Sequence, residues 1–292
     1  MHITLMKNTL LALSLAGVLA ATAQAQTPMG NLTGTGAIAY ESQYVFRGKK
    51  IADSSMQPKA EVGLQLSANS NFYIGSWANE PVSRRSGTGT SQFQKDEIDL
   101  YAGIYYNLPG NVAVDVGDTY YWYPEAGGSS IATPQSVPLD RSDEAYIGFI
   151  YNTVSFLGYN FNPAVYYYHD MNKDSNVVEI SGRYTWDLTP IVGFSGLSLQ
   201  PHIYGGWVKT NREYGDQVTP GTTGNWRNGY LYYGASFDLN YMISPYCYLF
   251  GNANFAGNTD GKTGGPAAIG GNPQLGGSEK SAWFGAGLKF RK

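Results

Sequence analysis

The sequence has few charged residues, only three histidines and a single cysteine. Charged side chains make up 14% of its 292 residues, against about 25% in ordinary soluble domains, while tyrosine and glycine are abundant. Disordered chains are rich in charge and poor in aromatic residues, so the composition argues against intrinsic disorder. One cysteine allows no internal disulfide, and a net charge of −3 offers no basic excess for binding nucleic acid.

One apolar run stands near the N-terminus, and it is too short to cross a membrane as a helix. Lys7 precedes the apolar residues 10–21, and Ala23-Gln24-Ala25 supplies the small-x-small pattern that signal peptidase recognises. A transmembrane helix needs roughly 20 apolar residues, which no later segment offers. The sequence therefore predicts a signal peptide over 1–25 that is cleaved during export.

The mature chain has the periodicity of strands and lacks that of helices. Residues 60–66 and 98–104, for example, alternate bulky apolar side chains with polar or small ones, which gives each strand one apolar face. This pattern predicts an all-β fold. The candidate strands are 36–47, 57–68, 72–80, 94–107, 112–124, 143–151, 159–168, 175–188, 197–208, 230–242, 246–256 and 281–290.

Loop lengths decide between a soluble β-sandwich and a membrane barrel. Gaps after odd-numbered strands hold about 9, 13, 18, 6, 21 and 24 residues, and gaps after even-numbered strands hold about 3, 4, 7, 8 and 3. Outer-membrane barrels alternate long extracellular loops with short periplasmic turns in this way, and they have an even strand count. We therefore predict a transmembrane antiparallel β-barrel of about 12 strands, located in the bacterial outer membrane.

The predicted barrel sets the domain organisation and the partners. The chain divides into the signal peptide, a periplasmic N-terminal segment at 26–35 and the barrel at 36–292. The expected partners are outer-membrane lipids and lipopolysaccharide, the barrel-insertion machinery and small solutes. Phe284, Leu288 and Phe290 share one face of the last strand, which resembles the C-terminal strand that this machinery recognises.

Aromatic residues gather toward the ends of the predicted strands. In membrane barrels such residues form girdles at the two interfaces between lipid and water. The sequence therefore predicts girdle positions for Tyr44, Phe46, Tyr106, Tyr120, Trp122, Tyr151, Tyr184, Trp186 and Tyr241.

Three residues fit the barrel poorly. Pro163 and Pro201 fall inside strands, where a closed barrel needs every backbone N–H for its ladders. Asp118 falls on the lipid face with Val114 and Val116, where a charge is costly. We expect β-bulges at both prolines, near the periplasmic rim, and a bulge or a shifted register at Asp118.

Charge is distributed unevenly between the predicted loops and the predicted wall. The six extracellular loops hold 11 basic and 9 acidic residues, whereas the strands with the C-terminal tail hold 7 basic and 13 acidic, a net charge of −6. Because charge facing lipid is costly, most of these side chains should face the lumen, where they either pair with one another or select ions. The lumen-lining candidates are Glu41, Arg47, Lys59, Glu61, Asp99, Asp115, Glu144, Glu179 and Arg183.

Several strings in the first two thirds of the chain are similar to one family. They resemble the opening strands of the TorF-type porins, which are small outer-membrane barrels of Gram-negative bacteria. The similar strings are 40–48, 72–79, 97–103, 115–117 and 120–124. Asp118 departs from the family pattern, which tends to have an aromatic residue there. The resemblance covers about 40–190 and implies a barrel with a porin role, but it implies no particular solute.

Two functions remain open from the sequence. The favoured one is an outer-membrane channel for passive diffusion of small solutes, with a modest cation preference because the wall is acidic. The alternative is a non-conducting barrel that acts as a surface anchor, adhesin or binding protein through its long loops. No enzyme is expected, because His169 and His202 have no serine two residues further on to serve as a nucleophile. No cofactor or metal is expected.

Overall fold

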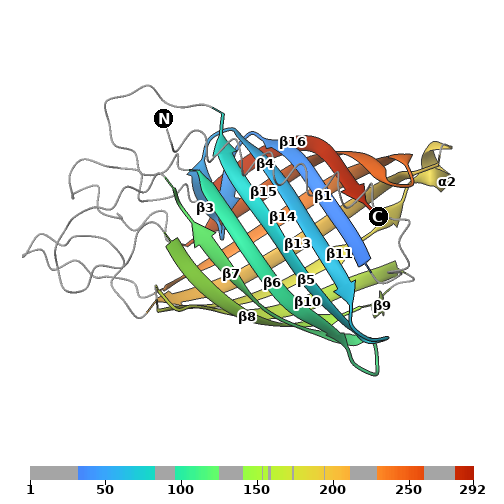
Figure 1. Ribbon diagram of the computed structural model, residues 1–292. Coiled ribbons are helices and arrows are strands. Elements are labelled where there is room, and N and C mark those ends of the chain that lie inside the picture. The colour runs from blue at the N-terminus through green and yellow to red at the C-terminus, as the bar shows by residue number, and fades with distance from the viewer. Residues whose placement is uncertain are drawn as a thin grey trace, which may run out of the picture.

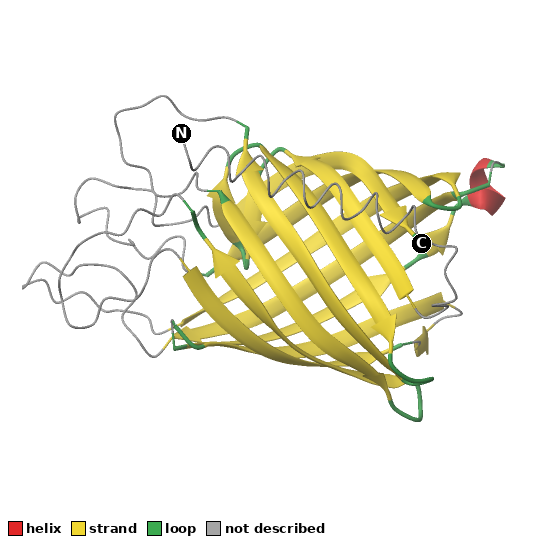
Figure 2. Ribbon diagram, viewed as in Figure 1, coloured by secondary structure: helices red, strands yellow, loops and turns green. Residues whose placement is uncertain are grey.

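The chain folds into a closed antiparallel β-barrel, as the computed structural model shows (Figure 1, Figure 2). The structure describes residues 32–82, 96–124, 141–152, 154–156, 159–172, 174–193, 195–210, 229–259 and 280–292. The signal peptide predicted at 1–25 lies outside the described residues. The all-β fold predicted from the sequence is confirmed.

Twelve long strands form the wall of the barrel. They are β1 (Leu32–Glu41), β4 (Ser55–Gln65), β5 (Ser70–Pro81), β6 (Glu97–Asn107), β7 (Val112–Trp122), β8 (Arg141–Tyr151), β10 (Tyr159–Asp170), β11 (Ser175–Tyr184), β13 (Leu197–Thr210), β14 (Gly229–Ser244), β15 (Cys247–Asn258) and β16 (Lys280–Arg291). Each pairs with its neighbours in chain order, and the β1–β16 pairing closes the ring. The predicted strand count is therefore confirmed.

Four short strands and one helix complete the described elements. β2 (Tyr44–Phe46) pairs with β3 (Lys49–Ala52) in a separate hairpin, while β9 (Val154–Phe156) and β12 (Trp186–Asp187) extend the ladders of β10 and β13. The helix α2 (Thr189–Val192) lies in the connection between β12 and β13. No helix among the described residues is long and apolar enough to span a membrane.

The first strand differs from its predicted bounds of 36–47. β1 begins at Leu32, inside the segment 26–35 that the sequence places outside the barrel, because β4 is long enough to pair with residues 32–35. It ends at Glu41, because Ser42 makes the last hydrogen bonds of the ladder to β16 with both its backbone and its side chain. The Ser42 N–H donates to the Phe284 carbonyl at 2.8 Å, and its hydroxyl accepts from the Phe284 N–H at 3.0 Å.

The outward face of the barrel is apolar and exposed. Leu100 and Ile104 on β6 are 49% and 47% exposed, and every other long strand carries similar side chains. Examples are Ile74, Val116, Phe149, Val165, Ile180, Ile203, Phe237, Leu249 and Phe284. A continuous apolar belt of this kind is unfavourable in water and favourable against lipid tails, and a closed barrel leaves no backbone edge unpaired in the membrane. The protein is therefore a membrane-spanning barrel of the outer-membrane type.

Aromatic residues at the rim follow the girdle prediction in part. Tyr106, Tyr151 and Tyr241 are exposed near the ends of β6, β8 and β14 that lead into short turns. Tyr44 and Phe46 were expected in a girdle, but they belong to the β2–β3 hairpin and point away from lipid. The prediction is wrong there because β1 has already ended when the chain reaches them.

Both prolines lie in ladders without a bulge. The β10–β11 pairing runs through Pro163, and the β13–β14 pairing runs through Pro201, with no shift of register. On the other edge, β10 passes from β9 to β8 at Pro163, and β13 passes from β12 to β11 at Pro201. The missing N–H therefore falls where that ladder is already interrupted, so the expected bulges are not needed.

Asp118 also lies in an unbroken register. It pairs with Ala102 on β6 and with Ala145 on β8, and it faces outward as the alternation predicts. The expected bulge is wrong. Asp118 stands in the half of β7 that leads into a long loop, where the cost of a charge falls toward the interface.

Candidate functional site

The β2–β3 hairpin folds into the barrel at the end that carries the long loops. Its two-residue turn, Arg47-Gly48, has φ of 48° and 74°, the pair of positive angles found in the type I′ turns that suit hairpins. Glycine is required at the second position, because a Cβ there would also collide with the Gly257 carbonyl of β15. The tip of the hairpin is therefore pressed against β15.

The hairpin touches the wall on several sides. The Tyr44 ring lies 5.2 Å from that of Trp77 on β5, and the Lys49 ammonium lies 4.1 Å from the Tyr230 ring centroid on β14. The Asn258 side chain on β15 donates to the Gly48 carbonyl at 2.6 Å. Since β5 and β14 lie on different sides of the ring, the hairpin crosses the lumen and narrows it.

A buried ion pair holds the hairpin tip. The Arg47 guanidinium makes two hydrogen bonds of 2.8 Å to the Glu144 carboxylate on β8, and both side chains are nearly inaccessible, at 13% and 3% exposure. Tyr121 donates to the same carboxylate at 3.0 Å, and the Tyr168 ring centroid lies 4.9 Å from the Arg47 guanidinium carbon. Burial lowers the pKa of Arg47, but the charge and hydrogen bonds of Glu144, with Tyr121 and Tyr232, together raise the pKa above its usual value, so the group stays charged. A bidentate pair of this kind fixes position as well as charge.

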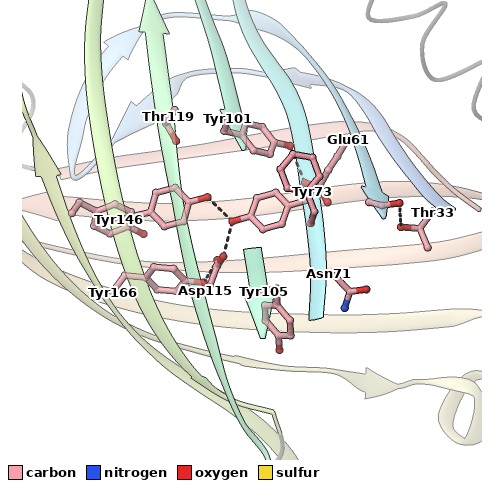
Figure 3. A pocket seen from close by; sticks show the side chains of 13 residues that line it. Thr33, Glu61, Asn71, Tyr73, Tyr101, Tyr105, Asp115, Thr119, Tyr146 and Tyr166 are labelled. Atoms are coloured by element: carbon pink, nitrogen blue, oxygen red, sulfur yellow. Dashed lines mark hydrogen bonds between the residues drawn. The ribbon is translucent and has the colours of Figure 1, made fainter. Parts of the chain in front are cut away.

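Beyond the hairpin, tyrosines converge on a second carboxylate (Figure 3). Tyr73 donates to Asp115 at 2.6 Å, and Tyr166 donates to it at 2.9 Å. Because Tyr73 donates its only hydroxyl proton to Asp115, Tyr146 must be the donor in the 2.5 Å hydrogen bond between Tyr146 and Tyr73. The hydroxyls of Tyr146 and Tyr73 form a chain polarised toward Asp115, and Tyr166 is a second, separate donor, so all three stabilise its negative charge.

Glycines on the wall make room for these rings. A Cβ at Gly103 would collide with Tyr73, one at Gly117 with Tyr146, and one at Gly148 with Tyr166, each on a neighbouring strand. Every ring therefore lies across an inward-facing glycine next to it. This packing keeps bulky tyrosines close to the wall, so the space between the walls stays open.

The open space is a chamber of about 580 Å³. Its lining comes from seven strands on one side of the barrel, β1, β4, β5, β6, β7, β8 and β10. The lining residues are Thr33, Glu61, Gly63, Asn71, Phe72, Tyr73, Tyr101, Tyr105, Asp115, Thr119, Tyr146, Tyr166 and Tyr168. Tyr168 lies against Arg47 of the hairpin and also lines the chamber, so the chamber is directly next to the hairpin.

Two predicted lumen residues pair with each other beside the chamber. The Lys59 ammonium lies 3.7 Å from the Glu61 carboxylate and 5.4 Å from the Tyr101 ring centroid. Tyr101 also donates to Glu61 at 2.9 Å. The charges of Lys59 and Glu61 therefore largely cancel at this point.

Two other predicted carboxylates are held by neutral donors. Glu41 accepts from the Asn252 side chain at 2.8 Å, and Glu179 accepts from the Tyr232 hydroxyl at 2.7 Å. Both side chains face inward, so their negative charge is directed to the lumen, and among the described residues neither forms a salt bridge.

Asp99 and Arg183, the last two predicted lumen residues, belong to none of the ion pairs and hydrogen-bonded groups described so far. Asp99 faces inward on β6, with Tyr121 next to it in the ladder to β7. Arg183 faces inward near the short-turn end of β11, level with His202, and is exposed. No cluster of three metal-ligating side chains occurs in the part of the chain that the structure describes.

Sequence reasoning missed the inner tyrosines and the hairpin. The alternation already placed Tyr101 on the same face as Asp99 and opposite Leu100, which marks it as an inward residue. The hairpin also had a signal, because Arg47-Gly48 separates the apolar run 44–46 from the residues that follow. However, residues 44–46 continue the apolar alternation of β1, so the sequence does not show that β1 ends at Glu41.

A family match covers most of the chain. Residues 25–216 match the family described as "Bacterial protein of unknown function (Gcw_chp)". The chain belongs to this bacterial family. The match spans the region in which the opening strands resemble porins, and it includes the hairpin and the whole chamber lining. A comparison with curated proteins finds no match.

Solved barrels of bacteria are similar in overall shape at low sequence identity. The KdgM porin has a TM-score of 0.45 and 7% identity, over 88% of this chain and 98% of that one. An outer-membrane channel from Pseudomonas putida F1 has a TM-score of 0.46 and 12% identity, over 91% and 97%. LpxR from Salmonella typhimurium has a TM-score of 0.49 and 12% identity, over 88% and 99%. The strand ladders of this chain establish its fold independently of these similarities.

Proposed function

We propose that this protein is a passive diffusion channel of the bacterial outer membrane, of the kind found in the TorF-type porins that its opening strands resemble. The observation that carries the proposal is the chamber of about 580 Å³ inside the wall, lined by hydroxyl, amide and carboxylate groups. Eight-stranded barrels are filled by their own side chains, and sixteen-stranded barrels leave a wide pore. Twelve strands with rings packed against glycine support a narrow water-filled path.

The path is proposed to prefer small cations and neutral solutes over anions. Arg47 and Lys59 are largely neutralised by Glu144 and Glu61, whereas the carboxylates of Asp115, Glu41 and Glu179 are held by neutral donors. Of the nine candidates, these three carboxylates would set the sign of the field, and Arg183 would oppose it near the short-turn end. Charges that face a narrow, partly desolvated lumen are less screened than charges on loops, so the wall should decide selectivity.

The hairpin is proposed to form the narrowest part of the path. In this arrangement the short turns face the periplasm, the hairpin lies near the cell surface, and outer-membrane lipids and lipopolysaccharide surround the wall. The barrel-insertion machinery would recognise β16, whose outward face carries Phe284 and Leu288. Solutes would then pass the hairpin before they reach the chamber.

Single-channel recording tests the proposal. Protein refolded in detergent and reconstituted in a planar bilayer should give small, discrete conductance steps in potassium chloride. A gel shift between unboiled and boiled samples shows independently that the barrel is folded. Folded protein that gives no conductance, with and without the hairpin, would refute the channel.

One observation favours the alternative of a non-conducting barrel. The hairpin contacts both sides of the lumen and is fixed by a buried ion pair, so it could close the barrel and leave the long loops to anchor or bind. A variant in which a short linker replaces 44–52 separates the two functions. Conductance in the variant alone would show that the native barrel is closed, and conductance in both proteins would support the channel.

A further inference from the structure

Cations inside the barrel sit in a recurring environment that combines one carboxylate with one aromatic ring. Arg47 lies beside Glu144 and 4.9 Å from the Tyr168 ring centroid. Lys289 repeats the arrangement, 3.7 Å from the Asp238 carboxylate and 4.3 Å from the Phe250 ring centroid. A carboxylate supplies charge attraction and a ring face supplies cation–π attraction, and the two together favour an ammonium or guanidinium group over water.

A third example lies at the edge of the chamber. The Lys59 ammonium lies 3.7 Å from Glu61 and 5.4 Å from the Tyr101 ring centroid, and both Glu61 and Tyr101 line the chamber. The chain itself therefore shows that an alkylammonium group is accommodated by this type of surface inside the lumen.

Asp115 has the same surroundings without a cationic side chain. It is 9% exposed, and its partners are the hydroxyls of Tyr73 and Tyr166. Among the described residues, no lysine, arginine or histidine forms a salt bridge with it. The two hydroxyls stabilise the carboxylate as an anion but leave its net charge uncompensated.

The chamber around Asp115 has the size and the lining of a binding site for a small ligand. Its volume of about 580 Å³ lies within the range of about 300–1,000 Å³ that is typical of such sites. Tyr105 and Tyr168 add aromatic surface. Figure 3 shows that Tyr73 and Tyr166 point toward Asp115 and that Tyr146 points toward Tyr73, each from a different strand. The hydroxyls of Tyr73 and Tyr166 are engaged with Asp115, and that of Tyr146 with Tyr73, so the lining around Asp115 offers negative charge and ring surface.

We propose that this chamber is a binding site for small organic ammonium ions, with Asp115 as the counter-charge and the surrounding tyrosines as the aromatic enclosure. A neutral ligand would leave the charge of Asp115 uncompensated, and an anion would be repelled by it. The proposal rests on the proposed channel only for the idea that the bound ion passes through the barrel. Binding itself does not require conduction.

The test uses two probes of the same shape. Choline carries a quaternary ammonium group, and 3,3-dimethyl-1-butanol has the same outline with a neutral carbon in its place. Isothermal titration calorimetry on the folded full-length protein in detergent, at low salt, should show binding of choline and none of the neutral isostere. Equal binding of both, binding of the isostere alone, or no binding of choline to folded wild-type protein would overturn the proposal.

Matched variants localise the site. Asp115→Asn should weaken choline binding about tenfold, because the charge is lost while the shape is kept. Asp238→Asn is the control, since Asp238 is an inward carboxylate beside Lys289 and outside the chamber lining, and it should leave binding unchanged. Equal losses in both variants would mean that binding follows the general field of the lumen, which would contradict the site.

A second pair of variants keeps the test decisive if Asp115→Asn fails to give the gel shift of a folded barrel. Tyr105→Phe keeps the ring and should retain choline binding, whereas Tyr105→Leu removes it and should weaken binding severalfold. Equal binding by both folded variants would count against the aromatic enclosure. Because conductance is recorded separately, a channel that conducts without binding choline would refute this proposal and leave the proposed function standing.

Discussion

The two parts of the lumen are built from the same kinds of side chain and differ in what meets the carboxylate. At the long-loop end, Glu144 faces Arg47 of the hairpin, so charge is cancelled and space is filled. In the chamber, Asp115 faces tyrosine hydroxyls, so charge persists and space remains open. One inserted hairpin can therefore turn part of an acidic, tyrosine-lined barrel into a constriction while the rest stays a chamber.

Removing the hairpin should give the largest effect. Glu41 and Ser55 are paired across β1 and β4, so a short glycine-serine turn can connect these strands without disturbing the wall. Without residues 44–52 the long-loop end becomes as open as the chamber, and single-channel conductance should rise severalfold. An unchanged conductance in folded protein would show that the hairpin is not the constriction.

Breaking the ion pair should give the next largest effect. Arg47→Ala leaves Glu144 buried without its counter-charge, which costs about 3–5 kcal/mol in buried pairs and should release the hairpin. We expect a higher conductance and a lower temperature for the gel shift that marks barrel unfolding.

Two controls accompany that variant. Lys50→Ala removes the partly exposed pair with Asp53 on the same hairpin and should change neither quantity. Arg47→Met combined with Glu144→Leu leaves no buried charge and should recover most of the unfolding temperature. If the double variant is as unstable as Arg47→Ala, the ion pair is not what fastens the hairpin.

Filling a glycine position should disturb the chamber and not the hairpin. A side chain at Gly103 must displace Tyr73, which frees Asp115 from one of its donors, so Gly103→Val should destabilise the barrel by about 1–3 kcal/mol. Gly251→Val is the matched control, because a Cβ at Gly251 has only one neighbour, at 3.8 Å. Thermal gel-shift curves compare the two, and equal curves would contradict the packing of rings on glycine.

Neutralising two inward carboxylates should give a small effect on selectivity. Asp99→Asn with Glu179→Gln removes two negative charges from the lumen, so the preference for potassium over chloride should weaken. Asp118→Asn is the control, because Asp118 faces outward and should have no influence on selectivity. Reversal potentials of the variants make the comparison, and the same shift in both would mean that the inner face does not set selectivity.

The fold could be predicted from the sequence because two local features, the alternation of side chains along each strand and the lengths of the loops, depend directly on the barrel architecture. Alternation placed Phe284 and Leu288 outward and Asp99 inward, and the separation of loop lengths distinguished a barrel from a sandwich. The strand interruptions at Pro163 and Pro201 could not be predicted, because they depend on where a neighbouring strand begins or ends.

The candidate site could be predicted only in its charges. Which face carries Glu144 or Asp115 follows from alternation, but their partners come from distant strands or from the hairpin. Arg47 meets Glu144 across a separation of 97 residues, and nothing local in the sequence indicates that contact. The Gly103–Tyr73 packing likewise depends on the register between two strands, which only the closed barrel determines.

The reversal potential of the wild-type channel in a potassium chloride gradient reports the net sign of the charge that faces the lumen. We expect a modest cation selectivity, since the lumen carboxylates held by neutral donors outweigh Arg183. The current should therefore reverse at a potential displaced toward the equilibrium potential of potassium. Reversal displaced toward the equilibrium potential of chloride would contradict it.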